Sequence, residues 1–378
     1  MQIKQNILYK KRAIEILPNI IKENNFKKIL FLSGKTAYQK FGVQITNQLA
    51  KAEAEFVLKL VDSVVTLNNI NQTVTFTKNC DVIIALGAGS VCDIAKVVAQ
   101  KINIPYVLIP SLPTCTGYFT DYAFVYEENV YKKYDVNPAL KILVDENIIC
   151  KADKFYVTEG QKFVLSHLET LFSWQYDNLF YDKQPSLQNL KLQLGKFKDN
   201  YEYFLSDTDD SKLVLMDILI ELSNCFQDIK DYNVYSMAFS LKRDTNLSFS
   251  SLCLLACKTL TYIYFQTLSL NQLYVFNLPD FDKLEKKLEI LEINKNFVNF
   301  DFIKQISNTA CFVRANSIKN QAFVLCEGLE KDLKNYKLPP NETQINLETL
   351  YQTFNVLPII YKCSTIFNLI YSIGLMNF

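Results

Sequence analysis

The stretch Cys80–Ile102, "CDVIIALGAGSVCDIAKVVAQKI", passes from an apolar run through a glycine turn into a helical pattern. The run Val82–Leu86 is apolar on both faces, which predicts a buried strand of a parallel sheet. After the turn, apolar residues return at spacings of three and four, which predicts a helix. The turn carries so little side chain that a ligand can approach its backbone, and the free amides of the following helix favour an anion such as pyrophosphate. Glycine also ends many strands for structural reasons, so the turn alone leaves both interpretations open.

The same alternation of strand and helix runs through the first 150 residues. The segments "KKILFLS", "AEFVLKLV" and "IPYVLIPS" predict further strands, and helices are expected between them, including one over residues 67–78 in spite of its poor helix propensity. Beyond residue 150, apolar positions recur at three and four with no further strand signal. We therefore predict an α/β Rossmann-like N-terminal domain, residues 1–150, followed by an all-α C-terminal domain, residues 151–378, with ligands at the carboxyl ends of the strands.

Composition excludes several classes of function. Lys and Arg number 40 against 39 Asp and Glu, so no basic field is available to attract nucleic acid. The first residues mix charges and lack the apolar core of a signal peptide. Ten cysteines without a CxxC pair favour reduced thiols and a cytoplasmic location. The tail "PIIYKCSTIFNLIYSIGLMNF" is long enough to span a bilayer, but its polar residues favour a buried terminal helix, so we expect no membrane partner.

A second loop invites comparison with a phosphate-binding motif. The segment "FLSGKT" lacks the first glycine of GxxxxGK[ST], which argues against a nucleoside triphosphatase. Gly34 nevertheless stands where a strand leads into a helix. We therefore expect Gly34 to lie beside a bound cofactor.

Three stretches together resemble one superfamily. The segment "GAGSVCDIAKVVAQKINIPYVLIPS" resembles, without a gap, the pattern GGGSxxDxAKxxA…xxPxxxxPT. The segment "PSLPTCTGYFT" resembles PTxASxDGxxS, and "LVDENIICKADKFYVTEG" resembles VDxxIIxxxPxxxxxxG. These patterns are similar to those of the iron-containing alcohol dehydrogenase, glycerol dehydrogenase and dehydroquinate synthase superfamily. The glycerol dehydrogenase and sn-glycerol-1-phosphate dehydrogenase branch is the most alike, and the likeness is good over residues 28–175.

The resemblance implies a dehydroquinate synthase-like fold and NAD or NADP as cofactor. Matched position by position, it assigns the pyrophosphate loop to Gly87, Ala88, Gly89, Ser90 and Val91. It also assigns cofactor contacts to Ser111, Thr114 and Thr120. The alternative for these hydroxyls is that they only cap turns after a strand. Lys96 matches a family lysine, for which a solvated or structural role is at least as good an interpretation.

At the substrate half of the implied site, this sequence departs from the family pattern. Family dehydrogenases hold a divalent iron or zinc with one aspartate and two histidines, and the position of that aspartate, aligned on Gly160 and Trp174, is Phe163. The aspartate of xxDG matches Thr116. The histidine positions fall near Cys253 or Cys257 and near Asn271, and the chain has only one histidine, His167. Two cysteines on one helical face could bind zinc, but without further ligands they are expected in the core. We expect no metal, with Thr116 and Phe163 in the substrate pocket.

Three functions remain open on this basis. The first is an NAD(P)-dependent polyol or polyol-phosphate dehydrogenase that works without the usual metal, with His167, one helical turn beyond Phe163, as the base. For His167 the alternative is an ordinary, partly buried helix residue. The second is a pseudoenzyme that binds a nucleotide as a sensor or partner protein. The third is a reaction of the dehydroquinate synthase kind, against which the missing ligands count equally. The expected partner is a small-molecule substrate or nucleotide, and a homo-oligomer is left open.

Overall fold

A computed structural model describes residues 6–61, 64–77, 79–182, 187–225, 233–243, 245–273, 281–290, 308–336 and 363–373, and a few positions between them. The chain divides into two compact units, which are treated separately below. Unit 1 comprises Met1–Glu127, Tyr131–Gly160 and Phe197–Gln227; unit 2 comprises Glu128–Val130, Gln161–Lys196 and Asp228–Phe378. These units follow packing, whereas the division at residue 150 follows the change of sequence pattern and stays a prediction.

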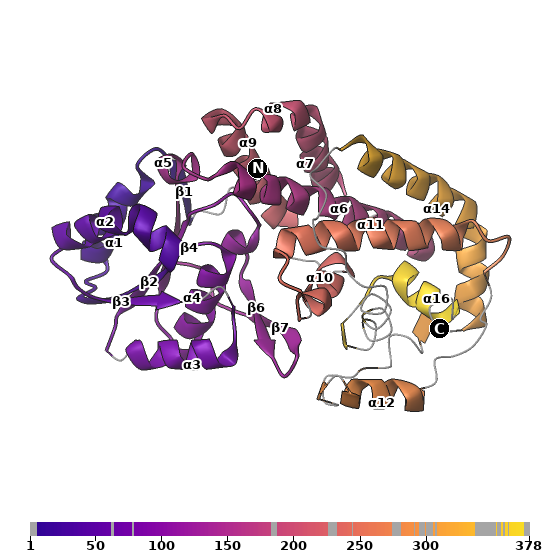
Figure 1. The fold of residues 1–378 in the computed structure, drawn as a ribbon, viewed down its shortest axis with the longest axis horizontal. Helices are drawn as coiled ribbons and strands as arrows, with labels where there is room; N and C mark the ends of the chain where they lie inside the picture. The colour runs from indigo at the N-terminus through magenta and orange to yellow at the C-terminus, as the bar shows by residue number, and fades with distance from the viewer. Residues whose placement is uncertain are drawn as a thin grey trace. The chain divides into compact units, whose positions relative to one another are not determined.

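Unit 1 is built on a parallel sheet (Figure 1). The sheet has six strands in the order β1-β8-β5-β4-β2-β3. Its strands are β1 (Ile7–Lys10), β2 (Lys28–Gly34), β3 (Glu55–Val61), β4 (Val82–Gly87), β5 (Tyr106–Pro110) and β8 (Lys141–Asp145). The predicted α/β Rossmann-like fold is confirmed. All four strands expected from the sequence are present.

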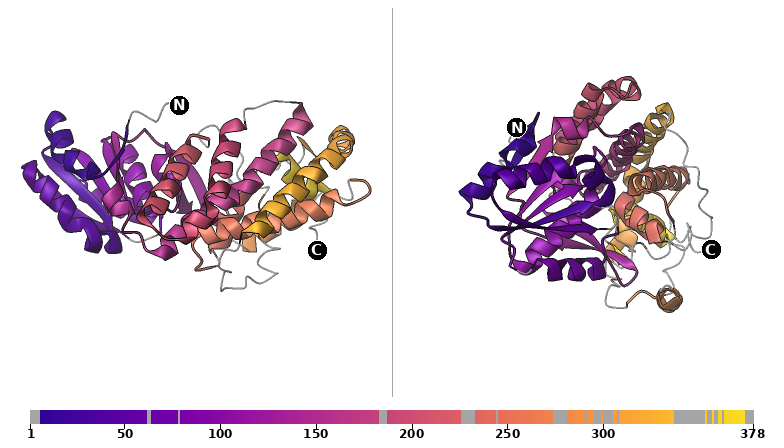
Figure 2. Two further views of the ribbon diagram at one scale, coloured as in Figure 1. Left: turned by 90° about the horizontal axis from the view of Figure 1, so that it is seen from above. Right: turned by 60° about the vertical axis from the view of Figure 1, so that its left-hand side comes forward.

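Helices cover both faces of this sheet (Figure 2). The turn of 3-10 helix η1 (Ala13–Ile16) and helices α1 (Leu17–Glu23) and α2 (Lys35–Lys51) pack on one face. Helices α3 (Leu67–Phe76) and α4 (Gly89–Ile102) pack on the other. Because side chains alternate along a strand, both faces must be apolar, which explains the unbroken apolar runs. The poor helix former α3 is helped by Thr66, whose hydroxyl accepts a hydrogen bond from the amide of Asn69.

Two strands at one edge and a hairpin escaped the sequence analysis. The strands β1 and β8 pair with each other, and β8 also pairs with β5. The hairpin consists of β6 (Tyr122–Glu127) and β7 (Val130–Asp135). Its two turn residues, Glu128 and Asn129, have φ values of 48° and 64°, as tight hairpin turns require.

The remaining part of unit 1 is helical. It contains α5 (Glu146–Ile149), the beginning of α6 (Lys154–Tyr181), α8 (Tyr201–Leu205) and α9 (Asp209–Cys225). Helix α9 is fixed to the sheet domain by hydrogen bonds, from Tyr9 to the carbonyl of Leu213 at 3.2 Å and from Lys212 to the carbonyl of Cys150 at 3.1 Å. A helical segment from beyond residue 150 thus completes the first unit.

Unit 2 is helical in its described residues apart from the start of β7. It contains the rest of α6, most of α7 (Gln188–Asp199), α10 (Asn233–Arg243), α11 (Phe249–Leu268), α12 (Phe281–Ile290), α14 (Thr309–Asn335) and α16 (Thr365–Ile373). The predicted all-α second half is confirmed for these residues. Every residue of α16 is buried, as expected of the terminal segment. Within the described part of the chain, no helix combines the length and apolar character needed to cross a membrane.

Candidate nucleotide site in the first unit

The carboxyl ends of β2 and β4 form a topological switch point. The two strands are neighbours, with Ser33 opposite Leu86 in the register. Helix α2, which follows β2, packs on one face of the sheet, and α4, which follows β4, packs on the other. Parallel sheets of this kind bind ligands in the crevice where successive helices separate to opposite faces. Gly34 and Gly87 end these two strands, so the sequence-predicted residues lie at the expected edge.

The glycine turn leads directly into a helix whose first amides have no side-chain cap. Ala88, the residue before α4, has an extended conformation and makes no side-chain cap hydrogen bond to the helix. The amides at Gly89 and Ser90 are therefore available to an anion. Val91 has a structural role, because a Cβ on Gly87 would lie 2.7 Å from Val91 Cγ2 and one on Gly34 would lie 3.4 Å from the same atom. Val91 thus brings the two glycine turns together.

The segment after β5 lies against the same turn. The amide of Ser111 donates to the carbonyl of Gly87 at 3.0 Å. The Sγ atom of Cys115 lies 3.1 Å from the position of a Cβ on Gly89. The hydroxyls of Thr114 and Tyr118 are 3.1 Å apart. The structure therefore brings three predicted segments to one place and adds Cys115, which the sequence did not single out because its position in the family pattern is unspecified.

Two threonines of this segment are turned into the protein. Thr116 and Thr120 are both buried. The Thr120 hydroxyl lies 3.3 Å from each of the carbonyls of Gly117 and Tyr122, so its geometry fits the structural alternative. Contact of Thr120 with a cofactor stays a prediction. Lys96 is also fully buried, which rules out the solvated alternative for this residue and favours the structural one.

In unit 2, Phe163 is part of an aromatic cluster. Its ring lies 4.8 Å from that of His167 and 5.9 Å from that of Tyr235, measured between centroids. Phe163 is 2% exposed and forms part of the core. A side chain in this position offers no metal ligand. Its predicted place in a substrate pocket is not tested.

His167 is buried and uses both ring nitrogens. Nδ1 lies 2.7 Å from the carbonyl oxygen of Phe163, which can only accept, so Nδ1 carries the proton. Nε2 then accepts from the hydroxyl of Tyr235 at 2.9 Å. Burial lowers the pKa of the imidazole to about 4. This geometry fits the structural alternative, and a role for His167 as a base stays a prediction that requires the bond to Tyr235 to break.

The other positions that the resemblance assigns to metal ligands do not fit a divalent ion. Cys253 and Cys257 are fully buried in α11, and Cys257 Sγ lies 3.9 Å from the carbonyl oxygen of Leu165. Burial also raises the pKa of the Cys257 thiol, whereas zinc binds the thiolate. Asn271 is exposed. Among the described residues no group of three or more His, Cys, Asp or Glu could hold a metal ion.

Residues 8–152 match the model of an iron-containing alcohol dehydrogenase family. A glycerol-1-phosphate dehydrogenase [NAD(P)+] from Geobacillus thermodenitrificans is 22% identical over 227 residues, 57% of this chain and 56% of the relative. One from Methanocorpusculum labreanum is 25% identical over 177 residues, 46% and 48% of the two chains. The chain thus spans about half the length of these curated relatives.

The likeness to solved structures extends over the whole chain. An iron-containing alcohol dehydrogenase superimposes with a TM-score of 0.66 at 14% identity over 99% of both chains. The NADH-dependent butanol dehydrogenase A of Thermotoga maritima has a TM-score of 0.67 at 13% identity, over 100% of this chain and 97% of that one. A glycerol dehydrogenase from Schizosaccharomyces pombe has a TM-score of 0.56 at 13% identity, over 91% and 95%. The family match thus covers residues 8–152, and the likeness to solved structures shows that the chain has the fold of iron-containing alcohol dehydrogenases.

Proposed function

We propose that this chain binds NAD or NADP at the Gly87–Gly89 turn and is a dehydrogenase for a polyol or polyol phosphate. The observation that carries the proposal is the assembly at the switch point. Two glycine-ended strands and the segment beginning at Ser111 meet around the uncapped start of α4. A pyrophosphate placed there would accept hydrogen bonds from backbone amides and would lie at the positive end of the helix dipole.

The names of the relatives support the substrate class. The curated relatives are glycerol-1-phosphate dehydrogenases that use NAD(P), and one neighbour in fold is a glycerol dehydrogenase. In such a reaction the carbinol C–H bond breaks, its hydride passes to NAD(P)⁺, and the hydroxyl proton is lost, so that a carbonyl and NAD(P)H form. We propose that this chain carries out this reaction without an Asp/His/His metal site, because Phe163, a buried thiol (Cys253 or Cys257) and the exposed Asn271 stand at the matched positions. We assign the proton transfer to no residue, since both nitrogens of His167 are hydrogen-bonded.

A second candidate function is nucleotide binding without catalysis. The observation that favours it is that Phe163 and His167 pack with Tyr235 as a core cluster, so the position matched to the family's aspartate carries no metal ligand. In that case the first unit binds the nucleotide and the second has lost its chemistry. The protein would then act as a sensor or partner.

Titration with NADH and NADPH tests both candidates. Binding is measured by the quenching of protein fluorescence. Turnover is then assayed with glycerol and glycerol 1-phosphate in the presence of NAD⁺ or NADP⁺, before and after treatment with a chelator. Binding with chelator-resistant turnover supports the dehydrogenase. Binding without turnover on any substrate supports the second candidate. Saturable binding of neither nucleotide would refute both.

A further inference from the structure

Lys96 lies in the second turn of α4 and its side chain is completely buried. Removing an ammonium group from water is costly unless the group is paired and hydrogen-bonded, so its partners must be built into the fold. The glycine turn precedes it on the same helix. Lys96 is therefore joined to the candidate nucleotide site by a rigid element.

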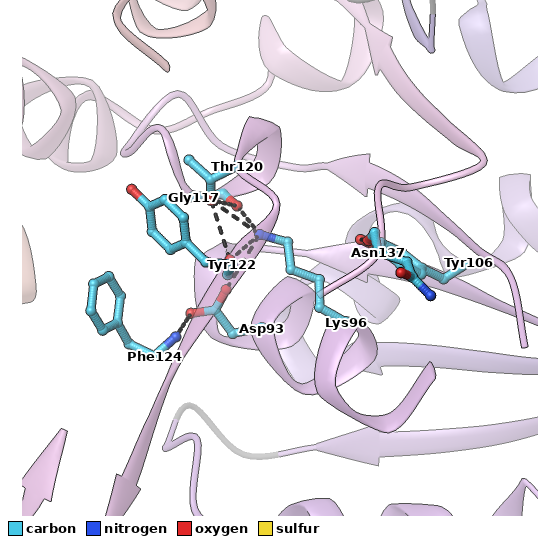
Figure 3. A network of polar contacts seen from close by, with 8 residues as sticks. All are labelled: Asp93, Lys96, Tyr106, Gly117, Thr120, Tyr122, Phe124 and Asn137. Atoms are coloured by element: carbon cyan, nitrogen blue, oxygen red, sulfur yellow. Dashed lines mark hydrogen bonds and ion pairs between the residues drawn. The ribbon is translucent and has the colours of Figure 1, made fainter. Parts of the chain in front are cut away.

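The ammonium group binds the segment that ends the loop after β5 (Figure 3). It donates to the carbonyl of Gly117 and, at 3.0 Å, to the carbonyl of Tyr122. The hydroxyl of Thr120 lies 3.4 Å from Nζ. These residues span the short 3-10 helix η2 (Gly117–Phe119) and the beginning of β6. One side chain thus holds both ends of a six-residue stretch.

Asp93, one helical turn earlier, completes the connection. Its Oδ1 lies 3.6 Å from Lys96 Nζ, and its Oδ2 accepts a hydrogen bond from the amide of Phe124 at 3.3 Å (Figure 3). Burial raises the pKa of the Asp93 carboxyl to about 6, while Lys96 and the Phe124 amide oppose the rise. The carboxylate is therefore mostly ionised at neutral pH and balances the buried ammonium.

The held stretch follows directly on the part of the loop that lies against the glycine turn. Cys115 Sγ is 3.1 Å from a Cβ position on Gly89, and the Ser111 amide bonds to Gly87. The loop is thus fixed at its start by Ser111 and at its end by Lys96. Between the two points lie Thr114 and Thr116, which carry predicted contacts. A change at the Lys96 end must alter how the loop meets the turn.

We infer that Lys96, with Asp93, is a positioning residue for the nucleotide: the pair holds the Ser111–Thr120 loop against the Gly87–Gly89 turn so that both can contact one ligand. The inference rests on the proposed nucleotide binding. Lys96 itself does not touch the ligand. Its effect on affinity comes from preorganising the loop. Without it, part of the binding free energy would be spent on ordering the loop.

The test compares the NADH affinity of three variants with that of the wild type. Lys96→Met keeps the length of the side chain and removes all three donors. Lys101→Met is the matched control, because Lys101 is exposed in the last turn of the same helix and donates a hydrogen bond of 3.1 Å to the side chain of Asn71. Asp81→Ala controls for stability, because Asp81 accepts from the amides of Lys27 and Lys28 at the amino end of β4, opposite the turn. Hydrogen exchange of residues 111–124 reports the order of the loop.

We expect Lys96→Met to weaken NADH binding by about tenfold and to speed exchange in residues 111–124, whereas Lys101→Met binds like the wild type. Asp81→Ala should lower the melting temperature without changing the affinity. Equal affinity of folded Lys96→Met and wild type would overturn the inference. So would an equal loss of affinity in Asp81→Ala at a matched melting temperature, since that loss would be one of general stability.

Two further variants keep the inference testable if Lys96→Met does not fold. Thr120→Val removes one hydroxyl next to the ammonium group and should weaken binding by about twofold. The double variant Asp93→Asn with Lys96→Met removes both charges of the pair, and it should fold yet still bind about tenfold more weakly. Wild-type affinity in both would overturn the inference. If the wild type itself binds no NADH or NADPH, the proposed function fails instead.

Discussion

At Gly87 the backbone passes so close to Val91 that no side chain fits. A Cβ there would lie 2.7 Å from Val91 Cγ2 and 2.8 Å from its Cβ, which are distances that real Cβ atoms do not show. The turn must therefore shift to accept even a methyl group. The same turn is the proposed contact for the pyrophosphate, so stability and binding are linked at this residue.

Gly87→Ala is predicted to lower the free energy of unfolding by about 2 kcal/mol, as overpacking does, and to weaken NAD(P)H binding by about tenfold. Urea unfolding and fluorescence titration measure the two effects. Gly195→Ala in α7 is the matched control, because nothing lies within 4 Å of a Cβ at that position. Unchanged binding in a folded Gly87→Ala protein would place the ligand elsewhere.

His167 makes the second prediction at this scale. Its pKa is lowered from 6.5 to about 4 by burial, so the unfolded chain takes up a proton between these pH values and the folded chain does not. The contribution of His167 to the free energy of unfolding is fully present above pH 6.5. It is lost as the pH falls towards 4, and the total loss is about 3 kcal/mol. His167→Gln keeps a polar group near Tyr235 and does not titrate. Urea unfolding from pH 7 to 4 should show the stability advantage of the wild type shrinking by that amount; an advantage independent of pH would contradict a neutral, buried imidazole.

Among the elements, those with a strong local pattern could be predicted from the sequence and those defined by their neighbours could not. The β4 strand, glycine turn and α4 helix were predictable because each has a clear period or a breaker. Strand β1 has four residues and gains its order from pairing with β8, a contact over more than 130 residues of sequence. The hairpin β6–β7 has a turn of Glu128 and Asn129 without glycine, which weakens its signal.

In the candidate site, likewise, residues that belong to a pattern along the chain could be predicted, and roles that depend on packing could not. The glycine turn and Ser111 follow from a pattern along the chain. The roles of Lys96 and Cys115 do not, because they depend on which side of α4 faces the loop after β5. Sequence spacing also makes His167 and Phe163 look accessible to a ligand, whereas the structure buries both against Tyr235. Sequence spacing shows which residues share one face of a helix. It does not show which other element packs on that face.

Helix α16 is attached by a buried polar network. Asn233 in α10 donates to Ser364 Oγ at 2.7 Å and to Glu169 Oε1 at 3.0 Å, and it accepts from the Ser364 amide at 2.8 Å. Tyr264 also donates to Glu169 at 2.7 Å. Burial raises the pKa of the Glu169 carboxyl, and these hydrogen bonds oppose the rise.

Asn233→Ala is predicted to lower the free energy of unfolding by about 3 kcal/mol, because it removes the acceptor of the buried Ser364 amide and a donor to both Ser364 Oγ and Glu169. Hydrogen exchange in residues 365–373 should become faster. Asn224→Ala serves as a control, since Asn224 is only partly buried and makes a 3.4 Å contact with Glu221. Similar losses in the two variants would show that the network does not fix α16.

At the scale of the whole molecule, the two units carry different parts of the superfamily pattern. The first unit has the family match and the glycine turn, and the second has the fold without the expected donor set at the matched positions. We therefore expect nucleotide binding that does not depend on a metal ion. Because a ligand that binds only the folded state stabilises it, NADH at one hundred times its dissociation constant should raise the free energy of unfolding by about 2.7 kcal/mol. Thermal unfolding with and without NADH checks this, and Gly87→Ala, with tenfold weaker binding, should keep only about half of the gain at the same NADH concentration.

The most direct test is a fluorescence titration of the purified protein with NADH and NADPH after exhaustive chelation, with metal analysis of the same sample. The proposal predicts saturable binding of one nucleotide per chain, unchanged by chelation, weakened by Gly87→Ala and not by Gly195→Ala. It also predicts no stoichiometric iron or zinc before chelation. Binding of neither nucleotide, or tight stoichiometric metal that binding requires, would contradict it.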